Sequence, residues 1–497
     1  MRLFGLMAVV IFMATCNTVI AQSWLDKLQE GFSQVDKVLH QTNKTKQTAK
    51  AKALPSHLSE SWRSSLFIDD IFNGEVAVVQ AGLQHKQTIV LVHGLGQLGM
   101  QDWFSVIPVL AKQYHIVTFD LPGFGYSAIP QGRYSPTNYA KVVAGITREY
   151  AKSKAIVIGH SMGGAISLRF ASMFPELLSK LVLVDAAGIL EKTAFIKHSG
   201  KLPIDEAQLP DVAKRFLAQA NNYGGSMIES TSTSKFSQGL TNFLFNQNDY
   251  TRQLIVSSSP NLNAALSLVE ENFTDAVYGL NVKTHIIWGA KDSVAPLRTG
   301  KVLANIIPNA QLQVIESAGH VPMKSHQEEF LTLLTQAIPN KPVTIKKEQP
   351  ETHQQAKLVC TKESNKHYQG HYQSIIIKDC SNVTLTNITA QSLFIENSLV
   401  SIENMTVDSK ALALEIINSD VTISTGKIYA EHGISLSGSR LDIAGVSINV
   451  SDKSIFSRDL SSVVTSLSEI NSPLYSGYTH STYQLNQQSI DTFLPLE

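Results

Sequence analysis

The chain has 497 residues, which is too long for one ordinary domain and predicts at least two. Hydrophobic residues make up 43% of it and charged residues 16%, a balance typical of folded globular proteins rather than disordered ones. The 41 basic and 41 acidic residues cancel, so the charge gives no indication of a nucleic-acid partner or a polyanionic substrate.

The chain begins with a segment typical of a secretory signal peptide. Arg2 precedes an apolar run over residues 3–14, which is short for a membrane span, and Val19-Ile20-Ala21 forms a small-residue cleavage pattern. We therefore expect residues 1–21 to be removed and the mature protein to be periplasmic or secreted. Cys16 leaves lipidation as an alternative, although the residues before it match a lipidation signal poorly.

Residues 22–66 predict an amphipathic helix followed by a basic linker. Apolar side chains recur there at helical spacing, at Trp24, Leu28, Phe32, Val35 and Leu39. Such a helix either packs on the domain that follows, which we favour, or lies on a membrane surface.

From residue 67 to residue 340, short apolar runs alternate with helical patterns. The runs lack the polar alternation of a half-exposed strand, which indicates strands buried on both faces of a parallel sheet. The runs lie at Thr88–Val92, 116–119, 155–158, 181–184 and 284–288, and the main helical patterns at 103–114, 137–150, 164–174 and 327–337. We predict an α/β domain with a doubly wound sheet.

Residues 188–281 interrupt this alternation. They contain no clear strand, and their periodic segments at 211–220 and 262–278 have helical spacing. Because they lie between two predicted strands, we expect an inserted helical cap over the active site.

The last third of the chain has a different composition and an internal repeat. A charged, proline-containing linker at 341–357 precedes a region rich in Ser, Thr, Asn, Ile and Val at 358–497. Serines that start similar short β segments follow one another at intervals of 17, 21, 20 and 22 residues, at Ser381, Ser398, Ser419, Ser439 and Ser461. A period near twenty without helices predicts an all-β, right-handed β-solenoid, and a β-sandwich is the alternative.

Cys360 and Cys380 are the two cysteines that remain after the signal peptide is removed. In an exported protein such a pair predicts a disulfide, with two buried free thiols as the alternative.

Ser161 is the candidate nucleophile. It lies in a G-x-S-x-G frame between the predicted strand at 155–158 and the helical pattern at 164–174. That setting is the one a nucleophile elbow requires. A serine hydroxyl is a poor nucleophile at neutral pH, so it needs a base that takes its proton and a group that orients the base.

His320 and Asp292 complete the pattern in chain order. His320 follows the strand-like run at 312–315 and is the candidate general base. Asp292 follows the run at 284–288 and is the candidate carboxylate that orients this base. Asp185, at the end of the preceding predicted strand, is the second choice for that carboxylate.

The backbone N–H groups of Leu95 and Met162 are the candidate oxyanion-hole donors. Leu95 lies in a turn after the first buried strand, and Met162 directly follows the nucleophile. Losing one such donor typically lowers the rate by on the order of 100–1,000-fold.

Five motifs together resemble the α/β-hydrolase superfamily, of the capped kind, over rather more than half of the chain. They are HGLG at 93–96, DLPGFGYS at 120–127, GHSMGG at 159–164, GAKDSVAP at 289–296 and AGHVP at 318–322. The resemblance implies the fold, the triad, the oxyanion hole and acyl transfer to water. It does not imply a particular substrate, because this superfamily includes esterases, lipases, C–C hydrolases and peroxidases.

The function expected from the sequence is an exported serine hydrolase that cleaves small-molecule or lipid carboxylic esters without a metal or cofactor. His367 and His371 are four residues apart, but no nearby acidic or cysteine residue completes a metal site. The C-terminal region is expected to contact an envelope component or a polysaccharide. The alternatives are a C–C or other hydrolase of the same fold and a surface glycan-binding protein with an inactive hydrolase body.

Overall fold

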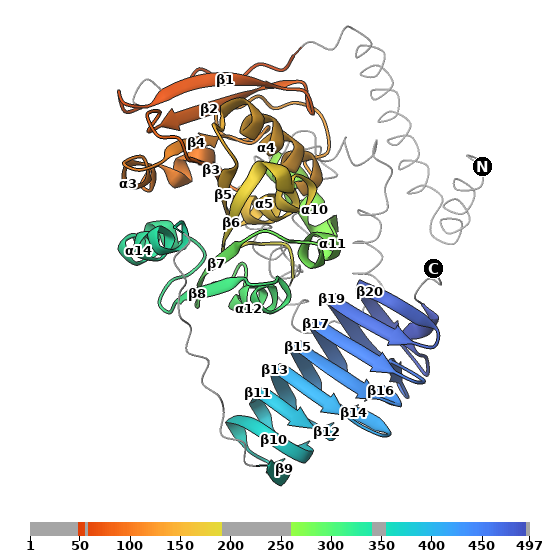
Figure 1. The fold of residues 1–497 in the computed structure, drawn as a ribbon. Coiled ribbons are helices and arrows are strands. Elements are labelled where there is room, and N and C mark those ends of the chain that lie inside the picture. Colours follow the sequence, from red (N-terminus) through yellow and green to blue (C-terminus); the bar gives the residue numbers. More distant parts are fainter. Residues whose placement is uncertain (1–47, 55–57, 191–259, 340–353, 494–497) are drawn as a thin grey trace, which may run out of the picture. The chain divides into compact units, whose positions relative to one another are not determined.

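The computed structural model describes residues 48–54, 58–190, 260–339 and 354–493 (Figure 1). The predicted signal peptide and amphipathic helix, most of the predicted cap and most of the linker at 341–357 lie outside these residues. Within them, no helix combines the length and the apolar character that crossing a bilayer would need.

The first part of the described chain is built on one eight-stranded sheet. Its strand order is β1-β2-β4-β3-β5-β6-β7-β8. From β4 to β8 in this order every neighbouring pair is parallel, whereas β1–β2 and β2–β4 are antiparallel pairs. The bounds are β1 Arg63–Asp69, β2 Gly74–Ala81, β3 Thr88–Val92, β4 His115–Phe119, β5 Ala155–His160, β6 Leu178–Val184, β7 Thr284–Gly289 and β8 Gln311–Ile315. The predicted parallel α/β sheet is present, and the antiparallel strands at its edge were not predicted.

The inner strands of this sheet are buried on both faces. Every residue of β3 is buried, and its side chains enter two different clusters in alternation. Val90 and Val92 belong to one cluster, and Ile89 and Leu91 belong to the other. Because helices cover both faces, the inner strands have continuous apolar sequences, and these allowed the strands to be predicted from the sequence.

The helices connect the strands and cover the sheet. They are η1 Gly99–Trp103, α3 Ile107–Leu110, α4 Pro136–Tyr150, α5 Met162–Met173, η2 Pro175–Leu177, α10 Pro260–Glu270, α11 Thr274–Tyr278, α12 Leu297–Ile306, α13 Pro322–Ser325 and α14 Gln327–Ala337. Helices α4, α5 and α14 match predicted helical patterns.

Two helical predictions are wrong in length. The pattern at 103–114 contains only the one-turn helix α3, because Pro108 lacks the N–H that a longer helix would need at this position. The pattern at 262–278 is divided into α10 and α11. Between them, the Asn272 side-chain oxygen accepts the Thr274 N–H at 2.9 Å, which satisfies the first N–H of α11.

The second part is an all-β domain of stacked, mostly parallel strands. Its bounds are β9 Gln354–Thr361, β10 Ser364–Lys378, β11 Ser381–Ala390, β12 Ser392–Glu396, β13 Leu399–Asp408, β14 Leu412–Ile417, β15 Asp420–Ala430, β16 His432–Ser437, β17 Arg440–Val450, β18 Ile455–Ser457, β19 Ser461–Ser472 and β20 Tyr475–Leu485. A short turn, η4 Ile490–Thr492, follows. Each strand pairs with the one about a period further along, so that Val383 lies opposite Val400. Only the β19–β20 pair is antiparallel among these strands, whereas a sandwich is built from antiparallel ones.

The repeated serines have a structural role in this domain. The Ser398 backbone N–H donates to the Ser419 hydroxyl at 3.0 Å, and Ser419 N–H donates in the same way to Ser439 at 3.1 Å. Ser439 N–H donates to Ser461 at 3.2 Å. These serines are buried, so the ladder satisfies backbone groups at the turns between strands. The period that is visible in the sequence follows from this ladder.

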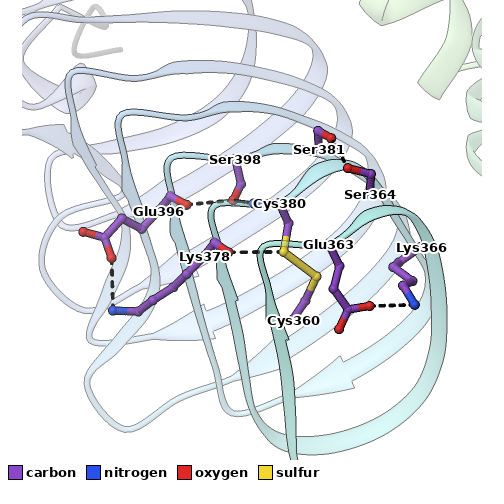
Figure 2. The surroundings of a disulfide bond; sticks show 9 residues. All are labelled: Cys360, Glu363, Ser364, Lys366, Lys378, Cys380, Ser381, Glu396 and Ser398. Atoms are coloured by element: carbon purple, nitrogen blue, oxygen red, sulfur yellow. Dashed lines mark hydrogen bonds and ion pairs between the residues drawn. A yellow bond between two sulfur atoms is a disulfide. The ribbon is translucent and has the colours of Figure 1, made fainter.

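A disulfide joins Cys360 on β9 to Cys380, which lies between β10 and β11 (Figure 2). Both cysteines are buried. The Cys380 backbone N–H also donates to the Ser398 hydroxyl at 2.9 Å, which places the bridge at one end of the serine ladder. The predicted pairing is therefore the one found in the structure.

Candidate active site

Ser161 lies on a one-residue turn between β5 and α5. Its backbone has φ 55° and ψ −123°, a combination that non-glycine residues rarely adopt. Ser161 N–H donates to the Val184 carbonyl on β6 at 3.0 Å, and the Ser161 carbonyl accepts from Ala187 N–H at 3.1 Å. Hydrogen bonds to β6 and to the residues that follow it therefore hold the strained Ser161 backbone in place.

Two glycines make this turn sterically feasible. A Cβ atom on Gly159 would lie 2.2 Å from the Gly163 carbonyl oxygen, and one on Gly163 would lie 2.3 Å from the Val92 carbonyl oxygen. Backbone carbonyls cannot move aside without disturbing the sheet. The G-x-S-x-G frame is thus required by the close approach of α5 to strands β3 and β5.

His320 is within hydrogen-bond reach of both other predicted site residues. It lies in the loop after β8, with its Nε2 atom 2.9 Å from Ser161 Oγ and its Nδ1 atom 2.8 Å from Asp292 Oδ2. An ionised carboxylate can only accept, so Nδ1 holds the proton and Nε2 is available to accept from the Ser161 hydroxyl. The structure therefore brings together a hydroxyl, an imidazole and a carboxylate that are 159 and 28 residues apart in the chain.

Asp292 is held by more than its bond to His320. Its Oδ1 atom accepts the backbone N–H groups of Val294 at 2.8 Å and Ala295 at 2.9 Å. Burial by itself would raise the pKa of Asp292, but the bond and charge of His320 and these two N–H donors together lower the pKa below its usual value. The Asp292 side chain, which is itself inaccessible to solvent, is thus held as an ionised acceptor.

Asp185, the second choice for this carboxylate, has a different environment. Its Oδ1 atom accepts the Gly289 N–H at 2.8 Å. Burial, followed by the charge of Asp292, raises the pKa of Asp185 well above its usual range. The bond to His320 comes from Asp292, whereas burial and the Asp292 charge favour the neutral form of Asp185.

The predicted oxyanion loop contacts the nucleophile. A Cβ atom on Gly94 would lie 2.8 Å from Ser161 Cβ, so the backbone before Leu95 lies directly against Ser161. His93 fixes this loop, because its Nε2 atom accepts Leu121 N–H at 2.9 Å and its Nδ1–H donates to the Gly94 carbonyl at 2.7 Å. Met162 is the first residue of α5, so its N–H has no acceptor within the helix.

Sequence reasoning missed one residue of the site, His160. Its Nε2 atom lies 2.7 Å from the backbone carbonyl oxygen of His320. It lies inside the motif that identified Ser161, but nothing in the sequence indicates which atom its ring contacts. That contact depends on how the loop after β8 returns to the end of β5.

No group of three or more His, Cys, Asp or Glu side chains suited to a metal ion occurs in the part of the chain that the structure describes. His367 Nε2 lies 2.6 Å from Thr386 Oγ1, a pairing between neighbouring strands of the C-terminal domain.

Comparison with known proteins places these observations in a family context. Residues 87–327 match the family model described as alpha/beta hydrolase fold. Over 258 residues the chain is 29% identical to the uncharacterized hydrolase YugF of Bacillus subtilis, a match that covers 49% of this chain and 86% of that protein.

Two further relatives have names that state a substrate class. The chain is 28% identical to Lipase 3 of Moraxella sp. over 48% of this chain and 72% of that protein. It is 25% identical to the 2-hydroxy-6-oxo-6-(2'-aminophenyl)hexa-2,4-dienoic acid hydrolase of Metapseudomonas resinovorans, over 52% of this chain and 84% of that protein.

Proposed function

We propose that this protein, in which residues 87–327 have the α/β-hydrolase fold, is a serine hydrolase that cleaves carboxylic esters through an acyl-enzyme on Ser161. The observation that supports the proposal is the continuous chain of hydrogen bonds from Ser161 through His320 to Asp292. The similarity to a protein that is named as a lipase supports an ester as the substrate class.

In the proposed reaction, Ser161 Oγ attacks the acyl carbon while His320 Nε2 takes its proton. The imidazolium that forms is stabilised by the ionised Asp292 through Nδ1–H. His320 then gives the proton to the leaving alkoxide, and the alcohol departs. In the second half, His320 takes a proton from water, the hydroxide attacks the acyl-enzyme, and the proton returns to Ser161 as the carboxylic acid leaves.

The N–H groups of Leu95 and Met162 are proposed to bind the oxyanion of each tetrahedral intermediate. Met162 N–H lies at the N-terminus of a 12-residue helix, where the helix dipole also favours negative charge. Leu95 N–H lies directly after Gly94, whose carbonyl accepts the hydrogen bond from His93.

Labelling with a fluorophosphonate probe tests the nucleophile. We expect the wild-type protein to be labelled and to hydrolyse p-nitrophenyl esters, and Ser161→Ala to lose both, with kcat lower by about 10⁴–10⁶-fold. Folding of the variant is checked by far-ultraviolet circular dichroism. Equal labelling of the variant, or no labelling of the wild type, would overturn the mechanism.

A C–C hydrolase of the same fold is the second candidate, favoured by the similarity to a dienoic acid hydrolase. Comparing the turnover of p-nitrophenyl acyl esters with that of vinylogous 1,5-diketones separates the two. A higher kcat/KM on the diketones would reverse our preference. Silence in both assays, together with binding on a glycan array, would favour a surface binding protein.

We also propose that the protein is exported and that its C-terminal domain is a right-handed β-solenoid that contacts an envelope component or a polysaccharide. The pattern of residues 1–21 supports export, and the period near twenty supports the solenoid. Outward-facing polar side chains such as Thr384 and Ser401 alternate with buried ones along these strands, which suits hydrogen bonding to sugars. Cell fractionation tests export, and co-sedimentation of the full chain with insoluble cell-wall polysaccharide tests the contact.

A further inference from the structure

His160 is a buried polar side chain that the proposed reaction does not use. It directly precedes Ser161, and only 4% of its surface is exposed. Its Nε2 atom lies 2.7 Å from the backbone carbonyl oxygen of His320. A carbonyl oxygen can only accept, so His160 Nε2–H is the donor and Nδ1 has no proton in the neutral ring.

The carbonyl that His160 binds belongs to a segment with little regular structure of its own. Residues 316–321 connect β8 to α13 and form neither helix nor strand. Among the described residues, the His160 side chain is the only hydrogen-bond donor that the structure gives to the His320 carbonyl. This bond therefore joins the backbone of the proposed base to the residue next to the nucleophile.

The surroundings of His160 leave its ring little freedom. The Trp103 ring lies perpendicular to it, with centroids 6.4 Å apart. A Cβ atom on Gly94 would lie 3.2 Å from His160 Nδ1 and 2.8 Å from Ser161 Cβ, so the oxyanion loop packs closely against both residues.

A polar side chain is costly at this position. Within the described structure, His160 Nδ1 is buried and has no hydrogen-bond partner. An apolar side chain of similar size would avoid the cost of burying that atom. The hydrogen bond from Nε2 to the His320 carbonyl is the interaction that offsets this cost.

His160 is also neutral where the reaction needs it to be. Burial, together with the charge of the neighbouring His320, lowers the pKa of His160 to about 4. The two ring centroids are 5.1 Å apart, so a charge on His160 would oppose the imidazolium on His320. A neutral donor anchors the loop without that repulsion.

We propose that His160 is a positioning residue, whose Nε2–H bond to the His320 carbonyl fixes the general base relative to Ser161 Oγ. The inference rests on the proposed function. A misplacement of about 1 Å between reacting groups costs on the order of 100-fold in rate, so loss of this bond affects kcat more than KM.

Two substitutions with side chains of equal length test the hydrogen bond from His160 to the His320 carbonyl. In His160→Gln, the amide nitrogen is three bonds from Cβ, as Nε2 is in histidine, so the donor is kept. In His160→Met, a similar volume lacks the donor. We expect His160→Gln to keep kcat for p-nitrophenyl acetate within about threefold of the wild type and His160→Met to lower it by about 10–100-fold, with KM nearly unchanged in both.

The rates are counted per active site, titrated with the fluorophosphonate probe, so that a partly unfolded preparation does not imitate the effect. Equal kcat per titrated site in the two variants would overturn the inference. A larger loss in His160→Gln than in His160→Met would also overturn it.

The tautomer of His160 provides a readout that needs no turnover. With ¹⁵N-labelled histidine, the nuclear magnetic resonance shifts of wild type at pH 6–8 should show a protonated Nε2 and an unprotonated Nδ1 for the resonance that is missing in His160→Gln. A protonated Nδ1 would refute the bond. If wild type shows the expected tautomer but neither labels nor turns over esters, the proposed function fails while the bond remains.

Discussion

Both sheets of this protein consist mostly of parallel strands, but they differ in the solvent exposure of the side chains along each strand. Strand β3 of the first sheet is buried along its whole length, because helices cover both faces. Strand β13 of the second sheet alternates, with Val400 and Ile402 buried and Leu399 and Ser401 more exposed. The first sheet brings the ends of distant strands to one site. The second repeats one local arrangement along its length.

Backbone strain and a shifted pKa are found together in the first of these regions. Ser161 and Asp185 both have positive φ angles there, and burial raises the pKa of Asp185. In the second region, the non-glycine residues with positive φ angles are mostly asparagines, which tolerate this conformation. Asn382 donates to Asn365 at 2.6 Å and Asn404 to Asn387 at 2.7 Å, so asparagine side chains on adjacent strands satisfy one another. We infer that the first sheet serves chemistry and the second regular stacking.

The largest expected effect tests the assignment of the two carboxylates in the first region. Asp292→Asn removes the acceptor that fixes the His320 tautomer, and we expect kcat to fall by about 10⁴-fold. Asp185→Asn, the matched control, replaces an acid whose neutral form burial already favours and should lower kcat less than about tenfold. Steady-state kinetics on p-nitrophenyl esters measure both. A reversed order would make Asp185 the orienting carboxylate.

A second effect concerns acid stability of the first region. Burial lowers the pKa values of His115, His160 and His285 to about 4 each. Histidines in the unfolded chain titrate near 6.5, so the unfolded state binds more protons between about pH 6.5 and 4. The free energy of unfolding should therefore fall by several kcal/mol as the pH is lowered through this window. Denaturant titrations at several pH values, followed by the fluorescence of the buried Trp103 and Trp288, would show a flat profile if this is wrong.

A third effect tests the alternation in the second region. Ile395 is fully buried on β12, whereas its neighbour Phe394 points to the other face. We expect Ile395→Ala to lower the free energy of unfolding of this domain by about 2–5 kcal/mol and Phe394→Ala by less than about 1 kcal/mol. Urea denaturation followed by circular dichroism compares them. Similar losses would mean that the strand does not have one buried face.

The smallest expected effect is removal of the disulfide. It closes a separation of 20 residues, and replacing Cys360 and Cys380 by serine should lower the stability of this domain by about 3 kcal/mol. Because the bridge lies outside the proposed active site, kcat should not change. The same denaturation curves with and without reductant provide the measurement, and identical midpoints would contradict the expectation.

Much of the fold could be predicted because it depends on neighbours in the chain. Strand β3 and helix α14 were predicted with the bounds they have, since burial on both faces and helical spacing are local patterns. Strands β1 and β2 were missed. The first half of β1 is largely exposed, so it lacks the continuous apolar sequence by which the inner strands were recognised.

The sequence by itself determined which residue types could perform chemistry: the glycines that permit the turn at Ser161, the order of serine, acid and histidine, and the twenty-residue period. Tertiary structure alone decided that Asp292 rather than Asp185 binds His320, and that His160 binds the backbone of that base. The physical reason is distance along the chain. Turns and periods arise from residues close in sequence, whereas these contacts join loops about 30 to 160 residues apart that only the assembled sheet brings together.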